Sequence, residues 1–168
     1  EFEDIIIHYL GFGEKQLAKK ALKMGLEQHP SSHGLMLLQS EILILDEKYD
    51  VALQVLEYVE KLNPYDEEIH LQKASIASKK GDHKSSINYL HQALRISEDP
   101  GEIWNLLGME HLLAEEYEEA SCFFKNCVNE NPEDYPSLFN LMHCYEQLEK
   151  TEPAIEALNE ILEHDPYC

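Results

Sequence analysis

The sequence predicts an all-α protein built as a solenoid of about ten antiparallel helices. Apolar residues recur at helical spacing along the chain, and no segment alternates as a strand would. One pattern also returns every 34 positions: a small residue, a large apolar residue four places later and a proline eight places after that, as in Ala120, Phe124 and Pro132. Self-similarity at such a period is typical of helical repeats that pack only on their neighbours.

A shift of the pattern by 34 residues in either direction finds the same residue types. The place of Ala120 is small in every copy, being occupied by Ala18, Ala52, Ser86 and Ala154. The place of Phe124 is taken in the other copies by Leu22, Leu56, Leu90 and Leu158. Proline returns at the place of Pro132 in three of four copies, and Glu98 is the exception. The chain therefore divides into five repeats of one domain, at residues 1–32, 33–66, 67–100, 101–134 and 135–168.

The first two repeats each predict two helices, and the four lie near residues 1–11, 14–28, 33–46 and 49–62. The second of these ends before His29, because the residue that precedes a proline is disfavoured in the α conformation. Ser32 can cap the next helix. That helix, at 33–46, is apolar on nearly all sides, so we expect neighbouring helices or a ligand to bury it.

The last three repeats predict six further helices, two of them within residues 101–134 and the others near residues 67–80, 83–96, 135–148 and 151–163. Gly81 and Asp82 form a turn in the third repeat, which is the most polar one. Pro153 falls in the first turn of the last helix, where its missing N–H costs little.

The fourth repeat resembles the tetratricopeptide repeat (TPR) family. It matches the family pattern at Trp104, Leu107, Gly108, Ala120, Phe124 and Pro132. It departs from the pattern at His111, where the family has a tyrosine, and the fifth repeat restores that aromatic residue as Tyr145. The resemblance implies a right-handed superhelical α-solenoid of helix-turn-helix units.

In members of this family, the first helix of each unit lines a concave groove that usually binds a peptide. By that similarity the groove here presents Leu37, Glu41, Ile44, Leu71, Ser75, Asn105, Met109, Leu112, Phe139, Asn140 and His143. These residues are mostly apolar or acidic, and the cations with which some members clamp a peptide carboxylate are missing. An apolar or basic segment is therefore the better candidate partner than an acidic one. The alternative is that the apolar groove residues only pack against adjacent units.

The charge of the chain is strongly negative. Lys and Arg number 13 against 33 Asp and Glu, which gives a net charge of −20 and would repel nucleic acid or an anionic lipid surface. Residues 101–168 hold sixteen carboxylates and only Lys125 and Lys150 as cations. A basic partner would be steered to this half, although an acidic balance can also serve only to keep a protein in solution.

The sequence contains no pattern typical of catalysis or of a bound cofactor. Phosphate-binding loops, nucleophile elbows and triad spacings are absent, and the four cysteines lack zinc-type spacing. His29 and His33 are separated by Pro30, so they do not share a helical face. We therefore expect no catalytic residue, no cofactor and no metal. Cys127 stands where the other repeats carry small or apolar residues, which favours a buried thiol in a reducing, cytoplasmic setting. No apolar run approaches the ~18 residues of a membrane span.

Two functions remain open. The first is a non-enzymatic scaffold that binds a peptide or protein segment in the groove. The second is a structural segment of a longer repeat protein without a ligand of its own, or a regulatory domain attached to an enzyme. It is suggested by the last helix, which carries apolar residues that no further helix covers: Ile155, Leu158, Ile161 and Leu162. We expect this uncapped C-terminal face to self-associate, to meet another molecule or to be covered by further residues of a longer chain.

Overall fold

The computed structural model describes residues 1–164, without the side chains of residues 157, 158 and 160–164. This part of the chain is helical and contains no strand, so the expected all-α fold is confirmed. The ten helices are α1 (Phe2–Gly11), α2 (Lys15–Gln28), α3 (His33–Leu45), α4 (Tyr49–Leu62), α5 (Glu67–Lys79), α6 (His83–Leu94), α7 (Gly101–Leu113), α8 (Tyr117–Glu130), α9 (Tyr135–Gln147) and α10 (Thr151–His164).

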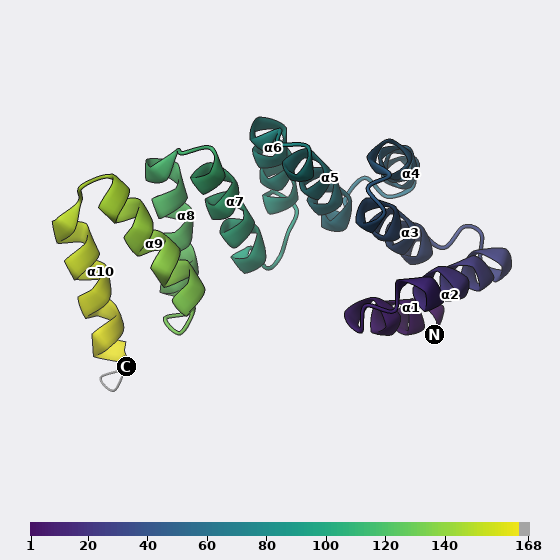
Figure 1. The fold of residues 1–168 in the computed structure, drawn as a ribbon, viewed down its shortest axis with the longest axis horizontal. Helices are drawn as coiled ribbons and strands as arrows, with labels where there is room; N and C mark the ends of the chain where they lie inside the picture. The colour runs from purple at the N-terminus through teal and green to yellow at the C-terminus, as the bar shows by residue number, and fades with distance from the viewer. Residues whose placement is uncertain (165–168) are drawn as a thin grey trace.

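Consecutive helices pair into hairpins that follow one another along an arch, with the two termini at opposite ends (Figure 1). Each helix packs on the next one in the chain, and α3 also contacts α1 and α5. In the described residues the buried apolar side chains form four separate clusters, each of which joins two successive repeats. The molecule is therefore a solenoid without a central core.

The repeated small residues lie where the two helices of a hairpin meet. Ala18, Ala52 and Ala120 are fully buried, as are the large residues Leu56 and Phe124 that follow four places later in their repeats. The side chain of Leu158 lies outside the described residues. Close packing at these positions explains why the small residue returns in every copy.

Ser86 and His111 depart from the repeat pattern, and each of their buried polar groups has a hydrogen-bond partner. Ser86 takes the place of alanine, and its buried hydroxyl donates a hydrogen bond to the carbonyl of Ala74 at 3.1 Å. The ring of His111 stacks on Phe123 at 5.5 Å between centroids, and its Nδ1 lies 2.7 Å from a carboxylate oxygen of Glu116. Both polar groups are thus buried with a partner.

The turn inside every hairpin uses one left-handed residue at the same place of the repeat. It is glycine in two repeats and glutamate in three, and the five residues are Gly13, Glu47, Gly81, Glu115 and Glu149, with φ between 55° and 74°. A positive φ is easy for glycine and strained for glutamate. The five hairpins therefore share a backbone conformation although their turn sequences differ.

Helix α3 is buried on several sides, as its largely apolar sequence predicts. It contacts α1, α2, α4 and α5, and Leu35, Ile42 and Ile44 are almost fully buried. Its N-terminus is capped by Ser32, whose side chain accepts a hydrogen bond from the backbone N–H of Leu35 at 3.4 Å. This helix is the central element of the surface described next.

Candidate functional site

The first helices of the repeats line two pockets along one face of the solenoid. The larger, which we call the N-terminal pocket, has a volume of about 310 Å³ and lies between α1, α3 and α5. Its lining residues are Glu3, Ile7, Gly34, Leu37, Leu38, Glu41, Glu68 and Gln72. The pocket therefore combines an apolar floor with three carboxylates, each of which comes from a different helix.

A second pocket, which we call the central pocket, follows between α5, α6 and α7. It has a volume of about 180 Å³ and is lined by Leu71, Ala74, Ser75, Ser78, Lys79, Ser86, Leu90, Leu106 and Glu110. Helix α5 contributes to both pockets, through Glu68 to the first and through Leu71 to the second. The two pockets are thus neighbours on one surface, which we call the candidate groove.

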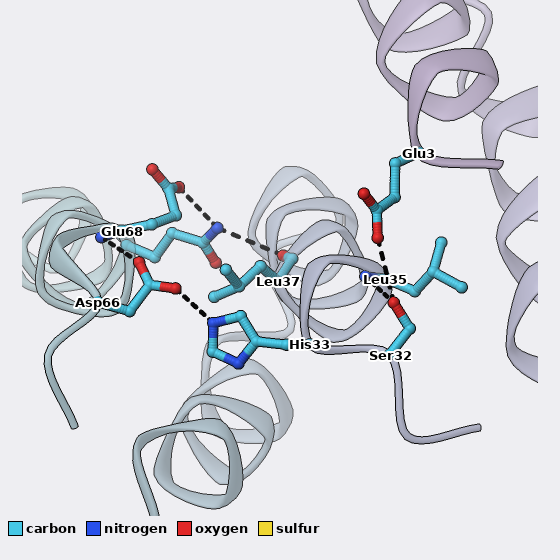
Figure 2. Close-up of polar contacts among 8 residues, drawn as sticks. Glu3, Ser32, His33, Leu35, Leu37, Asp66 and Glu68 are labelled. Atoms are coloured by element: carbon cyan, nitrogen blue, oxygen red, sulfur yellow. Dashed lines mark hydrogen bonds and ion pairs between the residues drawn. The ribbon is translucent and has the colours of Figure 1, made fainter. Parts of the chain in front are cut away.

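Glu3 is held at one wall of the N-terminal pocket by the start of α3. Its carboxylate accepts a hydrogen bond from the hydroxyl of Ser32 at 3.1 Å, as Figure 2 shows. The same carboxylate lies directly over Gly34, where any side chain atom would collide with it. Glycine at this place therefore lets an acidic group of α1 approach the backbone of α3.

Gln72 joins the opposite wall to α3. Its Nε2 donates to the carboxylate of Glu68 at 2.8 Å and to the carbonyl of Leu37 at 3.3 Å, and Figure 2 marks both bonds by dashed lines at the labelled Glu68 and Leu37. The Oε1 of Gln72 accepts from the buried hydroxyl of Ser40. The nearby Asp66 pairs with His33 and also accepts from the N–H of Glu68. These contacts hold Glu68 in position at the rim of the pocket.

Burial raises the pKa of two carboxyl groups in the N-terminal pocket. It raises the pKa of Glu41 above its usual value. Burial also raises the pKa of Glu68, with further contributions from the negative charges of Glu41, Asp66 and Glu102. Among the described residues, no lysine, arginine or histidine pairs with Glu3, Glu41 or Glu68. The pocket thus concentrates negative charge that the described chain leaves uncompensated.

The face continues toward the C-terminus as an apolar surface on α7 and α9. Phe139 is 74% exposed and Met109 is 36% exposed. Asn105 donates to the buried hydroxyl of Ser137 at 2.9 Å, and Asn140 lies with its Nδ2 3.5 Å from the sulfur of Met109. These contacts bring side chains of α7 and α9 together beside Phe139.

The structure places the groove residues expected from the sequence in three settings. Leu37 and Glu41 line the N-terminal pocket and Leu71 and Ser75 the central one. Five further residues on α7 and α9 are exposed or half-buried: Asn105, Met109, Phe139, Asn140 and His143. The remaining two residues, Ile44 and Leu112, lie in or against the hydrophobic core.

Ile44 is expected to line the groove, but it lies in the hydrophobic core. Its side chain is only 6% exposed and packs in the cluster that contains Ala52 and Leu56 of α4. It offers almost no surface to a partner. Leu112 is half-buried against the cluster of Phe124 and Leu141.

The first repeat also contributes to the groove, which the sequence reasoning did not anticipate. Glu3 and Ile7 stand 34 positions before Leu37 and Glu41, and all four line the same pocket. Extension of the repeat register by one unit would have found them. Glu68 stands 34 positions after Gly34 and was detectable in the same way.

Other kinds of site find little support in residues 1–164. Within this part no group of three or more His, Cys, Asp or Glu residues is arranged to hold a metal ion. None of its helices has the length and apolar character that crossing a membrane requires. Burial raises the pKa of the Cys144 thiol to about 11 and that of Cys127 above its usual value, so neither is a ready nucleophile at neutral pH.

Helical hairpins that stack side by side, with a groove along the first helix of each hairpin, define a helical-repeat solenoid. Residues 67–100 and 135–168 match the sequence pattern of the tetratricopeptide repeat family. The chain therefore contains tetratricopeptide repeats, as its resemblance to that family predicts. The two matched segments begin and end where the third and fifth expected repeats do.

Solved structures share this fold at low sequence identity. PilF of Pseudomonas aeruginosa has a TM-score of 0.81 at 14% identity, and the match covers 96% of this chain and 74% of the PilF chain. MamA of Desulfovibrio magneticus RS-1 has a TM-score of 0.75 at 18% identity, with 96% and 92% covered. YrrB, described as a TPR protein with an unusual peptide-binding site, has a TM-score of 0.68 at 18% identity, with 99% and 86% covered. Likeness at these identities establishes the fold alone.

Proposed function

We propose that this protein is a non-enzymatic scaffold that binds a peptide or protein segment in the candidate groove. The observation that carries the proposal is the pair of adjoining pockets, which are lined mainly by the first helices of successive repeats. Beyond them the face presents exposed Phe139 rather than a covered core. A continuous row of open sites on one face suits an extended or helical segment better than a small molecule. YrrB, with its unusual peptide-binding site, is a precedent for this use of the fold.

The partner segment is apolar or basic rather than acidic. The chain carries a net charge of −20, and in the part that the structure describes Glu41 and Glu68 face the groove without a cationic partner. An acidic segment would meet like charges at the N-terminal pocket, which costs binding energy. We place the scaffold in the cytoplasm, where its free cysteines stay reduced, and we propose that its repeats form one domain of a longer protein.

Peptide selection on the immobilised chain tests this function. Peptides recovered by display are measured by fluorescence anisotropy against the parent and against Phe139→Ala and Glu41→Lys. We expect each substitution to weaken binding about tenfold or more, as loss of a binding anchor does, with an unchanged melting midpoint. Leu62→Ala is the matched control, because Leu62 is 54% exposed on α4, which lines neither pocket. Selected peptides that bind the parent and both groove variants equally well would remove the groove from consideration.

A second candidate function is assembly within a longer repeat array. Ile155 of α10 is 53% exposed, and the expected remainder of that apolar face, Leu158, Ile161 and Leu162, lies outside the described side chains. Self-association through α10 predicts a mass above that of the monomer in light scattering, and Ile155→Glu should reduce it. A strict monomer at every concentration would argue against self-association.

A further inference from the structure

We propose that the N-terminal pocket binds a lysine or arginine side chain of the partner segment, which rests on the function proposed above. The aliphatic stem of that side chain lies on Ile7 and Leu37. Its cationic head lies among the carboxylates of Glu3, Glu41 and Glu68. The groove thus recognises a basic residue at one defined place and apolar residues beyond it.

The apolar part of the pocket supports a long aliphatic stem. Ile7 is 58% exposed on α1, and Leu37 is half-buried on the neighbouring α3. The volume of about 310 Å³ is at the small end of the range for ligand pockets, about 300–1,000 Å³. It therefore suits one long side chain. Lysine and arginine commonly bury their methylene stems on apolar surface while the charged end reaches a polar group.

The carboxylates supply the second half of the recognition. They come from α1, α3 and α5 and surround one cavity, and none of them has a cationic partner among the described residues. Some carboxylates elsewhere in the solenoid have a lysine partner, as Asp46 has Lys15 and Glu60 has Lys73. Partly buried carboxylates without a cation carry a desolvation cost that a bound cation would offset.

The arrangement favours a side chain over a metal ion. A divalent cation such as Ca²⁺ takes six to eight oxygen ligands at bonding distance. No group of three or more acidic, histidine or cysteine residues in the described chain is arranged that way. An ammonium or guanidinium group instead needs only acceptors around it, and hydrophobic contact along its stem.

Fluorescence anisotropy with a short labelled peptide of leucine, alanine and lysine tests the inference. Two matched peptides replace lysine by glutamine or by glutamate. We expect the lysine peptide to bind at least about fivefold more tightly than the glutamine peptide, and the glutamate peptide to bind more weakly still. No preference for the lysine peptide would overturn the inference.

Variants of the protein separate the pocket from the general negative charge. Glu41→Gln and Glu68→Gln should each weaken the lysine peptide about three- to fivefold and leave the glutamine peptide unchanged. Glu57→Gln makes the same change of charge on α4, outside both pockets, and should have no such effect. Equal losses in all three variants would show attraction by net charge alone and would refute a defined site.

Two further measurements test whether the loss of binding arises at this pocket and not from unfolding. Leu37→Ser should also weaken the lysine peptide, because it removes the surface on which the stem lies. Circular dichroism melts show that each variant is folded. If Phe139→Ala reduces peptide binding while the pocket variants do not, the groove function survives and this inference fails. If neither class of variant matters, both fail.

Discussion

A close contact between Gly108 and Phe124 sets the distance between the two helices of the fourth hairpin. A Cβ atom at position 108 would lie 2.7 Å from the ring of Phe124, which is fully buried. We expect Gly108→Ala to lower the free energy of unfolding by about 1–3 kcal/mol, as overpacking does, in urea titrations. Gly11→Ala is the control: its Cβ meets nothing within 4 Å, so this variant should match the parent or exceed it by up to about 1 kcal/mol. Equal destabilisation by both would contradict the packing argument.

The left-handed turn residues allow a paired test of backbone strain. Glu115 has a φ of 61° and Gly81 a φ of 74° at the equivalent place of the third repeat. A side chain in this conformation costs about 1–2 kcal/mol, so Glu115→Gly should raise the melting midpoint and Gly81→Ala should lower it. Entropy of the unfolded chain reduces the gain from glycine. A rise in the midpoint for Gly81→Ala would be incompatible with the observed turn.

At this scale the sequence predicts packing better than turn conformation. The small residue and its large partner four places later recur in every repeat, and the structure buries Ala120 and Phe124 as expected. The glutamates of the turns have no intrinsic preference for a positive φ. Only the glycines at the same place, Gly13 and Gly81, indicate that the conformation is shared.

At the scale of the helices, Asp46 ties α2 to the end of α3. Lys15 reaches Asp46 at 2.7 Å and Lys19 pairs with its other oxygen, and hydrogen bonds from these lysines lower the pKa of the Asp46 carboxyl to about 2. Because the unfolded chain takes up this proton first as the pH falls, the stabilisation is complete above about pH 4 and is lost toward about pH 2. The difference in urea midpoint between the parent and Asp46→Asn should therefore shrink steadily below about pH 4. A difference that stays constant there would argue against the ion pairs.

The helices themselves are well predicted, and the faces they present are less so. Expected and observed helix ends agree within about two residues, because prolines, glycines and a serine cap mark them. Ile44 is expected in the groove and lies in the core. Helix α3 is apolar nearly all round, so its pattern does not indicate which side faces a partner. That assignment needs the positions of α1, α4 and α5.

At the scale of the whole molecule, charge repulsion acts against the fold. The net charge of −20 is concentrated in residues 101–168, where two lysines face sixteen carboxylates. At a salt concentration of about 0.1 M or more, repulsion between exposed charges is largely screened beyond a separation of about 10 Å. We expect sodium chloride at about 0.5 M to raise the melting midpoint by about 2–4 °C, which corresponds to about 1 kcal/mol. A fall in the midpoint would mean that the ion pairs between helices outweigh the repulsion.

If the N-terminal pocket binds a basic residue as proposed, Gly34 is a place where one methyl group changes which partner is bound. The carboxylate of Glu3 lies over the bare backbone of Gly34, and a Cβ there would push aside only the end of a flexible side chain. Gly34→Ala should therefore keep the melting midpoint while it weakens the lysine peptide about threefold. Glu3→Gln should weaken it to the same extent. A lineage could in this way redirect the scaffold to a new sequence motif without altering any charged residue and without a loss of foldability.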